Sequence, residues 1–600
     1  MCGIIGYIGE KEALPILIDG LKKLEYRGYD SAGVSVISDG KIKTIKTKGR
    51  INELSEKLKH FRLNGKTGIA HTRWATHGEP NEINSHPHTD CSEKISIVHN
   101  GIIDNYSSLK EILRREGHNF KSETDSEVIA HLVEKFYNGN LEEAVLSAVK
   151  IIDGAYGLCV IHENHPDEII CIRKSSPLIL GVGQDEMFVA SDLTAVISHT
   201  NKIIYLNDNE LVKLTKNNYK IKKLNGDSVD PKIHEIKWSI EEIEKGKFKH
   251  FMLKEIFEQP SVLLNTIRGR IGKGKVNLSI NVDLNKIKKI ILIACGTSWH
   301  SALIGKYLIE EISQIPVEVD YASEYRYRNP LINKTDLVVA ISQSGETADT
   351  LAALRLAKEK GAKTISIVNV VGSSLSREVD SGIYLHVGPE VGVASTKAFT
   401  SQVLALILFS LYLRYKKGVP IDEKFLEEIK NISTAIKNVL DNSEKIKEIA
   451  LKYKDSKNFL YFGRGINFPV ALEGALKLKE ISYIQAEGYP AAEMKHGPIA
   501  LIDDEMPIVF IATKSHLSDK ILSNIQEVKA RRGRIIGILS EGDKSFDKFF
   551  NEKIEVPEVD EKLSPIVNSV VLQLLAYYIA DAKGLSVDKP RNLAKSVTVE

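Results

Sequence analysis

Cys2 is the residue most clearly suited to catalysis, because it directly follows the initiator methionine. Methionine before a small side chain is normally removed, so we expect Cys2 to begin the mature chain. A free α-amine has a pKa near ~7.7–8 and is partly neutral at cell pH. It can take the thiol proton of its own residue, directly or through one water, without a histidine–aspartate pair. Cys2 is therefore a candidate nucleophile.

Five further segments carry polar residues that could serve such a nucleophile. In chain order they are YRGYDSAG (26–33), HTRWATHG (71–78), SHPH (85–88), HNGIIDNY (99–106) and SETDSE (122–127). Each of these residues has an ordinary alternative when it is taken alone. Arg73 could be a surface charge, and Asp125 could be an acid that stabilises a helix N-terminus. Asn100–Gly101 could be a hairpin turn. Their order and spacing together resemble the class II glutamine amidotransferase domain, an N-terminal nucleophile glutaminase.

This resemblance implies a glutamine site. Arg73 would bind the α-carboxylate of glutamine, which suits a forked guanidinium, and Asp125 would bind its α-ammonium. The Asn100 side chain and the Gly101 N–H would form the oxyanion hole for the tetrahedral intermediate. Trp74 would gate a channel that keeps the released ammonia away from water. The other substrate-binding candidates in the same motif are Thr76 and His77.

A polar loop after a buried strand, in DLVVAISQSGETADTLAAL, offers a different chemistry. Its hydroxyl and amide groups come from Ser342, Gln343, Ser344 and Thr347. The free N–H groups of the following helix attract an anion. The loop suits a phosphate without a Walker lysine or magnesium, although serine and glycine also favour a simple capped turn. Residues 295–298 (CGTS), after the previous strand, offer a second edge to the same site.

Charged side chains further along the chain could move protons. Glu473, Lys477 and Glu480 stand at i, i+4 and i+7, on one face of a helix. The ordinary alternative is a solvated face of salt bridges. His496 stands beside glycine and proline in EMKHGPIALID, and Lys595 lies in the A-K-S tripeptide near the end of the chain.

Segments across almost the whole chain resemble one family, the glutamine–fructose-6-phosphate aminotransferases (isomerizing). They are SQSGET, GVASTKAFT (392–400), ALEGALKLKEISYI, KHGPIALID and PRNLAKSVTVE. The two C-terminal copies of a strand–loop–helix pattern resemble the sugar isomerase (SIS) domains of this family. The resemblance implies fructose 6-phosphate as the acceptor of the glutamine nitrogen, and no cofactor or metal.

The same resemblance implies roles for the C-terminal residues. The phosphate would be held by the SQSGET loop residues named above, with Thr297, Ser298, Val393 and Ala394 nearby. His496, supplied by the neighbouring subunit of a homodimer, would assist ring opening. Lys595 would form a Schiff base at C2, and Glu480 would move a proton between C1 and C2. Lys477 would be a second proton carrier, and the division of roles between Lys477 and Lys595 stays open.

The element pattern predicts an α+β layered domain followed by two tandem doubly wound α/β domains. Short strands separated by turns dominate residues 2–225, and strand–loop–helix units occur twice from about residue 285. The expected divisions are the glutaminase domain 2–225, a connector 226–284 with a short helix in SIEEIEKGKF, the first SIS domain 285–425, the second SIS domain 450–590 and a polar tail 591–600.

Composition excludes several other classes of protein. The formal net charge of +2, from 81 basic and 79 acidic side chains, gives no reason to expect nucleic acid or an anionic membrane as partner. Five dispersed cysteines without a C-x-x-C pair disfavour a disulfide scaffold or a zinc site and fit a reducing compartment. The N-terminus is not a signal peptide, and the apolar run 403–413 is too short to span a bilayer. We expect a cytoplasmic protein.

Two rival enzymes and one binding protein are the alternatives. A phosphoribosyl-pyrophosphate amidotransferase would need a phosphoribosyltransferase fold, and an asparagine synthetase would need an S-G-G-x-D-S loop. Neither signature follows residue 226. SIS domains also serve as sugar-phosphate sensors, but a sensor would not need Cys2, Glu480 or Lys595.

Overall fold

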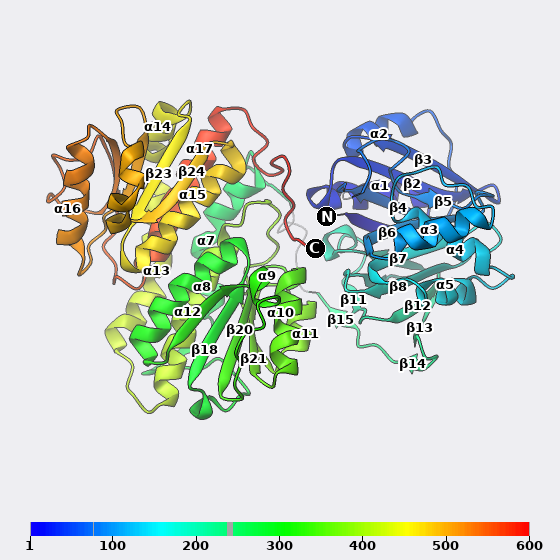
Figure 1. The fold of residues 1–600 in the computed structure, drawn as a ribbon, viewed down its shortest axis with the longest axis horizontal. Helices are drawn as coiled ribbons and strands as arrows, with labels where there is room; N and C mark the ends of the chain where they lie inside the picture. Colours follow the sequence, from blue (N-terminus) through cyan, green and yellow to red (C-terminus); the bar gives the residue numbers. More distant parts are fainter. Residues whose placement is uncertain (1, 76, 237–243, 599–600) are drawn as a thin grey trace. The chain divides into compact units, whose positions relative to one another are not determined.

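The computed structural model describes residues 2–75, 77–236 and 244–598. The chain forms two compact units, Met1–Ile243 with Ser596–Glu600, and Glu244–Lys595. The first unit is coloured blue to teal in Figure 1, and the second runs from green to red.

The first unit contains two stacked antiparallel sheets between two layers of helices. Alternation along β1 (Gly3–Gly9) shows how the layers form, because Ile5 and Tyr7 face the outer helices, whereas Ile4 and Ile8 face the second sheet. Helices α1 and α2 cover the first sheet, and α3, α4 and α5 cover the second. The expected α+β layered fold is confirmed.

The strands of the first unit are short and antiparallel. The first sheet has the order β15-β11-β9-β10-β1-β4-β2-β3. Besides β1, its strands are β2 (Ser31–Ser38), β3 (Lys41–Lys48), β4 (Thr67–Arg73), β9 (Ile179–Val182), β10 (Glu186–Ala190), β11 (Lys202–Tyr205) and β15 (His234–Glu235). The second sheet has the order β14-β13-β12-β8-β7-β6-β5. Its strands are β5 (His88–Thr89), β6 (Ile95–Ile103), β7 (Gly154–His162), β8 (Ile169–Lys174), β12 (Glu210–Thr215), β13 (Asn218–Lys223) and β14 (Ser228–Val229).

Among the helices of the first unit, α4 is buried on all sides from Glu127 to Val133, whereas the others bury one face. The helices are α1 (Ala13–Leu24), α2 (Ile51–Leu58), α3 (Tyr106–Arg115), α4 (Glu127–Phe136) and α5 (Leu141–Val149), with short 3-10 turns η1 (Glu25–Arg27) and η2 (Leu193–Ala195).

The second unit holds two five-stranded parallel sheets of the same topology. Their orders are β19-β18-β20-β21-β22 and β24-β23-β25-β26-β27. The strands are β18 (Lys289–Ala294), β19 (Val317–Tyr321), β20 (Asp336–Ser342), β21 (Lys363–Val368), β22 (Ser381–Tyr384), β23 (Asn458–Gly463), β24 (Gln485–Pro490), β25 (Pro507–Ile511), β26 (Arg534–Ser540) and β27 (Glu552–Val556). Two doubly wound domains were expected and are confirmed.

Helices cover both faces of each parallel sheet, which explains the nearly continuous apolar strands. They are α7 (Phe251–Ile267), α8 (Gly296–Ser313), α9 (Ala322–Tyr325), α10 (Ala348–Glu359), α11 (Ser374–Glu378), α12 (Lys397–Lys416), α13 (Glu423–Asp441), α14 (Ser443–Tyr453), α15 (Phe468–Ser482), α16 (Ser518–Lys529) and α17 (Ser564–Ala582). The remaining elements are the hairpin β16 (Ile271–Gly272) and β17 (Lys275–Val276) and the turns η3 (Leu284–Lys286), η4 (Gly465–Asn467), η5 (Ala491–His496) and η6 (Pro498–Leu501).

Helices α12 and α17 are long and apolar enough to cross a membrane, but 89% and 83% of their most apolar windows are buried inside the protein. A helix that is apolar on all sides is typical of a buried core position. The run 403–413 is accordingly part of α12, in the core of the second unit.

The segment 226–284, expected as a connector, is divided between the two units. Strands β14 and β15 extend the two sheets of the first unit, whereas α7 packs into the core of the second. Of the helix expected in SIEEIEKGKF, residues 239–243 lie outside the described residues, and 244–248 form a bend and a turn instead.

Candidate active sites

Cys2 lies just before β1, and two backbone groups of Trp74, the residue that follows β4, contact its sulfur. The N–H of Trp74 lies 3.3 Å from Cys2 Sγ, and the carbonyl oxygen of Trp74 lies 3.5 Å from it. Arg27 Nε and Asn100 Nδ2 donate to the Cys2 carbonyl at 3.3 and 3.1 Å. Burial raises the pKa of the Cys2 thiol, and the Trp74 N–H and the nearby arginines only partly offset this. The buried thiol therefore needs a base before it can attack.

Asn100 is held in a defined orientation by a buried neutral histidine. His71 Nε2 lies 3.1 Å from both Asn100 Oδ1 and the His99 carbonyl, and 3.0 Å from His86 Nδ1. The two oxygens are acceptors and suit the tautomer with a proton on this nitrogen. Burial lowers the pKa of His71 to about 3, so the ring stays neutral. With its oxygen held by His71, Asn100 turns its NH2 group toward Cys2.

Gly101 must be glycine at its position in β6. Its φ is +137°, and a Cβ there would lie 1.9 Å from the carbonyl oxygen of Ala155 on the neighbouring strand. Asn100 and Gly101, the two expected oxyanion-hole residues, lie in the second half of β6, and the Asn100 side chain reaches the Cys2 carbonyl.

A cation and an anion flank the same place. Arg73 ends β4, and its guanidinium donates to the carbonyls of Gly78 (3.1 Å) and Glu79 (3.3 Å) and to that of His77. Burial lowers the pKa of Arg73, and Cys2, Asp30 and Asp125 are near enough to counteract this. Asp125 Oδ2 accepts the Ile103 N–H at 2.9 Å. This pair can bind the two charges of an amino-acid zwitterion.

The remaining residues of the HTRWATHG motif are placed as follows. His77 Nδ1 lies 4.0 Å from Asp125 Oδ1. The Trp74 ring packs edge-on against Tyr29, with centroids 5.8 Å apart. Thr76, an expected substrate-binding residue, lies outside the described residues.

In the second unit, the SQSGET loop connects β20 to the N-terminus of α10. Ser342 Oγ accepts the Gly345 N–H at 3.0 Å and lies 3.2 Å from Thr347 Oγ1. Ser344 Oγ accepts the Glu346 N–H at 3.2 Å. Gly345 has φ +68°, and a Cβ there would collide with Ser373. The loop presents hydroxyls and the free N–H groups of a helix start, which suits a phosphate.

The strand order brings Thr297 and Ser298 to the same edge of the sheet. Strand order reverses between β18 and β20, and ligands of open α/β sheets bind at the carboxyl ends of such neighbouring strands. Helix α8 starts after β18 with these two residues in its first turn. Ser298 Oγ accepts from Gln402 Nε2 of α12 at 3.0 Å.

The face of α15 with Glu473, Lys477 and Glu480 is not a solvated row of salt bridges. The side chains of Lys477 and Glu473 are 1% and 2% exposed. Lys477 Nζ lies 2.6 Å from Glu480 Oε2 and 3.0 Å from Thr297 Oγ1. Glu473 Oε2 lies 2.7 Å from His300 Nδ1 of α8. Burial raises the pKa of the Glu480 carboxyl, Lys477 lowers it, and Glu473 raises it further, with a raised pKa as the net result. Glu480 is therefore placed to hold and release a proton.

Lys595 in the C-terminal tail is anchored by a buried carboxylate that the sequence did not reveal. Its Nζ donates to Glu390 Oε2 at 2.5 Å and to the Gly392 carbonyl at 2.7 Å. Glu390 Oε1 also accepts the Thr396 and Ala398 N–H groups at 2.9 and 3.0 Å. The tail is thus fastened to residues 390–398, which include the expected site residues Val393 and Ala394. Lys595 is near enough to Glu480 to lower its pKa.

Glu255 on α7 gives this region a pH dependence. It accepts the N–H groups of Val391 (2.5 Å) and Gly392 (3.0 Å), and burial, followed by the charge of Glu390, raises its pKa to about 7. A carboxyl with a raised folded-state pKa stabilises the fold below its unfolded pKa, and this contribution is lost as pH rises through about 7. Glu255→Gln, which mimics the protonated acid, should flatten the decline of Tm between about pH 4.5, the ordinary pKa of the carboxyl, and about pH 7.

Thermal melts over a series of pH values measure this effect. Glu448→Gln, which changes an exposed carboxylate on α14, should keep the wild-type slope. If Glu255→Gln also keeps that slope, Glu255 is not protonated near neutral pH in the folded chain.

His496 lies in η5 with its side chain exposed.

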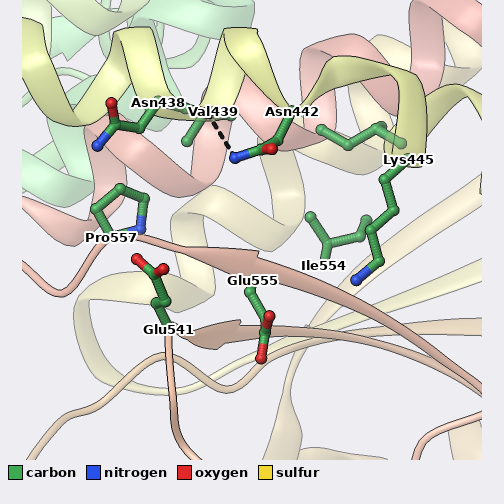
Figure 2. A pocket seen from close by; sticks show the side chains of 9 residues that line it. Asn438, Val439, Asn442, Lys445, Glu541, Ile554, Glu555 and Pro557 are labelled. Atoms are coloured by element: carbon green, nitrogen blue, oxygen red, sulfur yellow. Dashed lines mark hydrogen bonds between the residues drawn. The ribbon is translucent and has the colours of Figure 1, made fainter.

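A pocket of about 280 Å³ lies between α13, α14 and β27, and none of the candidate site residues that the structure describes lines it. Figure 2 shows Asn438, Asn442 and Lys445 on the helices facing Glu541 and Glu555 across it.

The fold and the two sites together define a glutamine amidotransferase domain joined to a pair of SIS domains. The family model of the glutamine amidotransferase domain matches residues 71–198, and that of the SIS domain matches 283–411 and 452–580. The chain is 53% identical over 617 residues to the glutamine–fructose-6-phosphate aminotransferase [isomerizing] of Chlorobaculum tepidum and 49% identical over 605 residues to that of Thermus thermophilus, with 100% of both chains covered in each comparison. It is also similar to the solved C-terminal domain of the glucosamine-fructose-6-phosphate aminotransferase from Francisella tularensis, with 43% identity, a TM-score of 0.56, and coverage of 58% of this chain and 100% of that one. The chain belongs to the glutamine–fructose-6-phosphate aminotransferase (isomerizing) family.

Three supporting residues were missed by the sequence interpretation. Arg27 and His71 stand inside the YRGYDSAG and HTRWATHG motifs, so the motifs themselves held the signal. Glu390 stands two residues before GVASTKAFT and has no local pattern that marks it.

Proposed function

We propose that this chain converts glutamine and fructose 6-phosphate to glutamate and glucosamine 6-phosphate. Two observations carry the proposal: Trp74 and Asn100 contact Cys2, and Lys595, whose side chain is buried, lies near enough to Glu480 to lower its pKa. We also propose that the enzyme is cytoplasmic and acts as a homodimer.

In the first unit, Arg73 and Asp125 would hold the α-carboxylate and α-ammonium of glutamine. With Met1 removed, the α-amine of Cys2 would take the thiol proton, which the buried thiol does not release by itself. The thiolate would attack the side-chain amide, and the Asn100 NH2 and Gly101 N–H would stabilise the oxyanion. Ammonia leaves, and water then releases glutamate from the thioester.

In the second unit, the SQSGET loop would bind the phosphate and Lys595 would form a Schiff base at C2 of the open-chain sugar. Ammonia replaces Lys595 at C2. Glu480 then takes a proton from C1 and returns it to C2, and the proton of the C1 hydroxyl passes to the nitrogen, which leaves an aldehyde at C1 and an amine at C2. The buried contact with Lys477 would modulate the proton affinity of Glu480. His496 of a neighbouring subunit would assist ring opening. This side chain is exposed in the single chain, so a second subunit could approach it.

Formation of glucosamine 6-phosphate from the two substrates tests the proposal directly. A sugar-phosphate sensor with the same SIS fold would bind fructose 6-phosphate and make no product. Glutamate release without amino sugar would leave only the glutaminase half of the proposal standing.

Trp74→Ala should separate the two half-reactions. The contacts of Trp74 with Cys2 Sγ come from its backbone, which alanine keeps, so glutamate release should change less than about threefold. If the indole gates the passage of ammonia, less than one glucosamine 6-phosphate should form per glutamate. Glucosamine 6-phosphate and glutamate measured in the same reaction give this ratio. A ratio that stays at one would show that Trp74 does not gate the passage of ammonia.

A further inference from the structure

Four side chains with metal-binding donors converge in the first unit, apart from Cys2. Cys91 lies in the turn between β5 and β6, and His118 lies in the loop after α3. His131 and Glu134 stand one turn apart on α4. No two of the four donor atoms are more than 4.8 Å apart.

Most distances in the cluster are close to those of tetrahedral zinc ligands. Cys91 Sγ lies 3.7 Å from His118 Nδ1 and 3.5 Å from His131 Nδ1. Glu134 Oε2 lies 2.8 Å from His118 Nδ1 and 3.2 Å from His131 Nδ1. With Zn–S about 2.3 Å and Zn–N or Zn–O about 2.0–2.1 Å, tetrahedral donors lie about 3.6 Å apart for S···N and about 3.3 Å for N···O. The other two pairs, Cys91 with Glu134 and His118 with His131, lie within 4.8 Å, and bringing their donor atoms to tetrahedral spacing would complete the site.

Hydrogen bonds alone satisfy this cluster poorly. Each Nδ1 atom faces both the sulfur of Cys91 and the same oxygen of Glu134, yet a ring nitrogen has one proton or one lone pair to offer. A cation at the centre would be bound by all four donors at once.

The surroundings are those of a metal site. The other ring nitrogen of the buried His131 faces Glu127 Oε1 at 3.7 Å, beyond hydrogen-bond distance, and a carboxylate on this side of a ligating histidine is typical of metal sites. Glu127 is itself fixed by the Lys121 and Ser122 N–H groups, both at 2.7 Å. The Asn119 N–H points at Cys91 Sγ from 3.4 Å, which suits a thiolate. Cys91 is exposed, so an ion can enter from solvent.

We propose that Cys91, His118, His131 and Glu134 bind a structural zinc ion. One thiolate, two neutral imidazoles and one carboxylate are ligands that zinc accepts, and four protein ligands leave no open position for catalysis. Binding would release the thiol proton of Cys91 to solvent. The ion would fasten the β5–β6 turn to α4, which begins two residues after Asp125. It would therefore stabilise the segment that carries the expected ammonium ligand of the glutamine site.

The test uses the purified full chain, stripped with a chelator and dialysed. We expect one zinc per chain on titration with Zn²⁺, a thiolate–cobalt absorption band with Co²⁺, and a higher Tm with zinc than with chelator. Cys91→Ala, which changes an exposed side chain and should fold, should bind zinc at least about 100-fold more weakly and lose the cobalt band and the zinc-dependent rise in Tm.

His60→Ala, which removes an exposed histidine of the same unit, is the matched control and should behave as wild type. A wild-type chain that binds no stoichiometric zinc would overturn the proposal. Equal zinc affinity in wild type and Cys91→Ala would do the same, because the ion would then lie elsewhere.

Discussion

Cys2→Ala should lower glutamate release from glutamine by on the order of 10⁴-fold or more, the scale seen when an enzyme loses its nucleophile. The thiol is the group proposed to form the covalent intermediate in the glutamine site. The neighbouring Asn100, Arg73 and Asp125 would remain to bind glutamine, so the loss should fall on kcat rather than on binding. Glutamate measured by a coupled assay gives the rate.

Two internal controls accompany the Cys2 variant. Binding of fructose 6-phosphate should be unchanged, because its proposed site lies in the second unit. Amino-sugar formation from a high concentration of ammonia would be a weaker, secondary signal. Substantial glutamate release by Cys2→Ala would assign the nucleophile to another residue. A chain that retains Met1 should also be inactive as a glutaminase, since an amide would replace the proposed base.

Glu480→Gln should abolish most amino-sugar formation and leave glutamine hydrolysis in place. A positioned general acid–base group contributes about 10²–10⁴-fold, so we expect a fall in kcat of that size. The amide side chain of the Glu480→Gln variant has the shape of the carboxyl, but it cannot move a proton between C1 and C2 of the sugar. Proton exchange at C1 of fructose 6-phosphate with solvent deuterium, followed by NMR, should be lost with it.

Glu448→Gln is the matched control for this variant, since it removes one negative charge from an exposed position on α14. It should keep both activities. If Glu480→Gln retains C1 exchange while Lys477→Met loses it, the proton carrier is Lys477, and the roles proposed for these two neighbours must be exchanged.

Much of the fold could be predicted because its signals are local. The apolar run Ile4–Ile8 indicates a buried strand, and the apolar runs that precede SQSGET and CGTS indicate buried parallel strands. The structure of the connector was harder to predict from the sequence. Its strands β14 and β15 have two residues each and form only by pairing with sheets built from other parts of the chain.

The residues of the candidate sites likewise fall into those that local sequence reveals and those that only the tertiary structure brings together. Sequence by itself determined Cys2, the oxyanion pair Asn100–Gly101 and the SQSGET loop, since each carries its chemistry within a few consecutive residues. Tertiary structure alone decided that Asn100 contacts Cys2 across 98 residues and that Lys595 pairs with Glu390 across 205. It also decided that Cys91 meets His118, His131 and Glu134, which the lack of a C-x-x-C pair had disfavoured. The physical reason is that turns and periodicity depend on neighbouring residues, whereas these contacts depend on how sheets and helices pack.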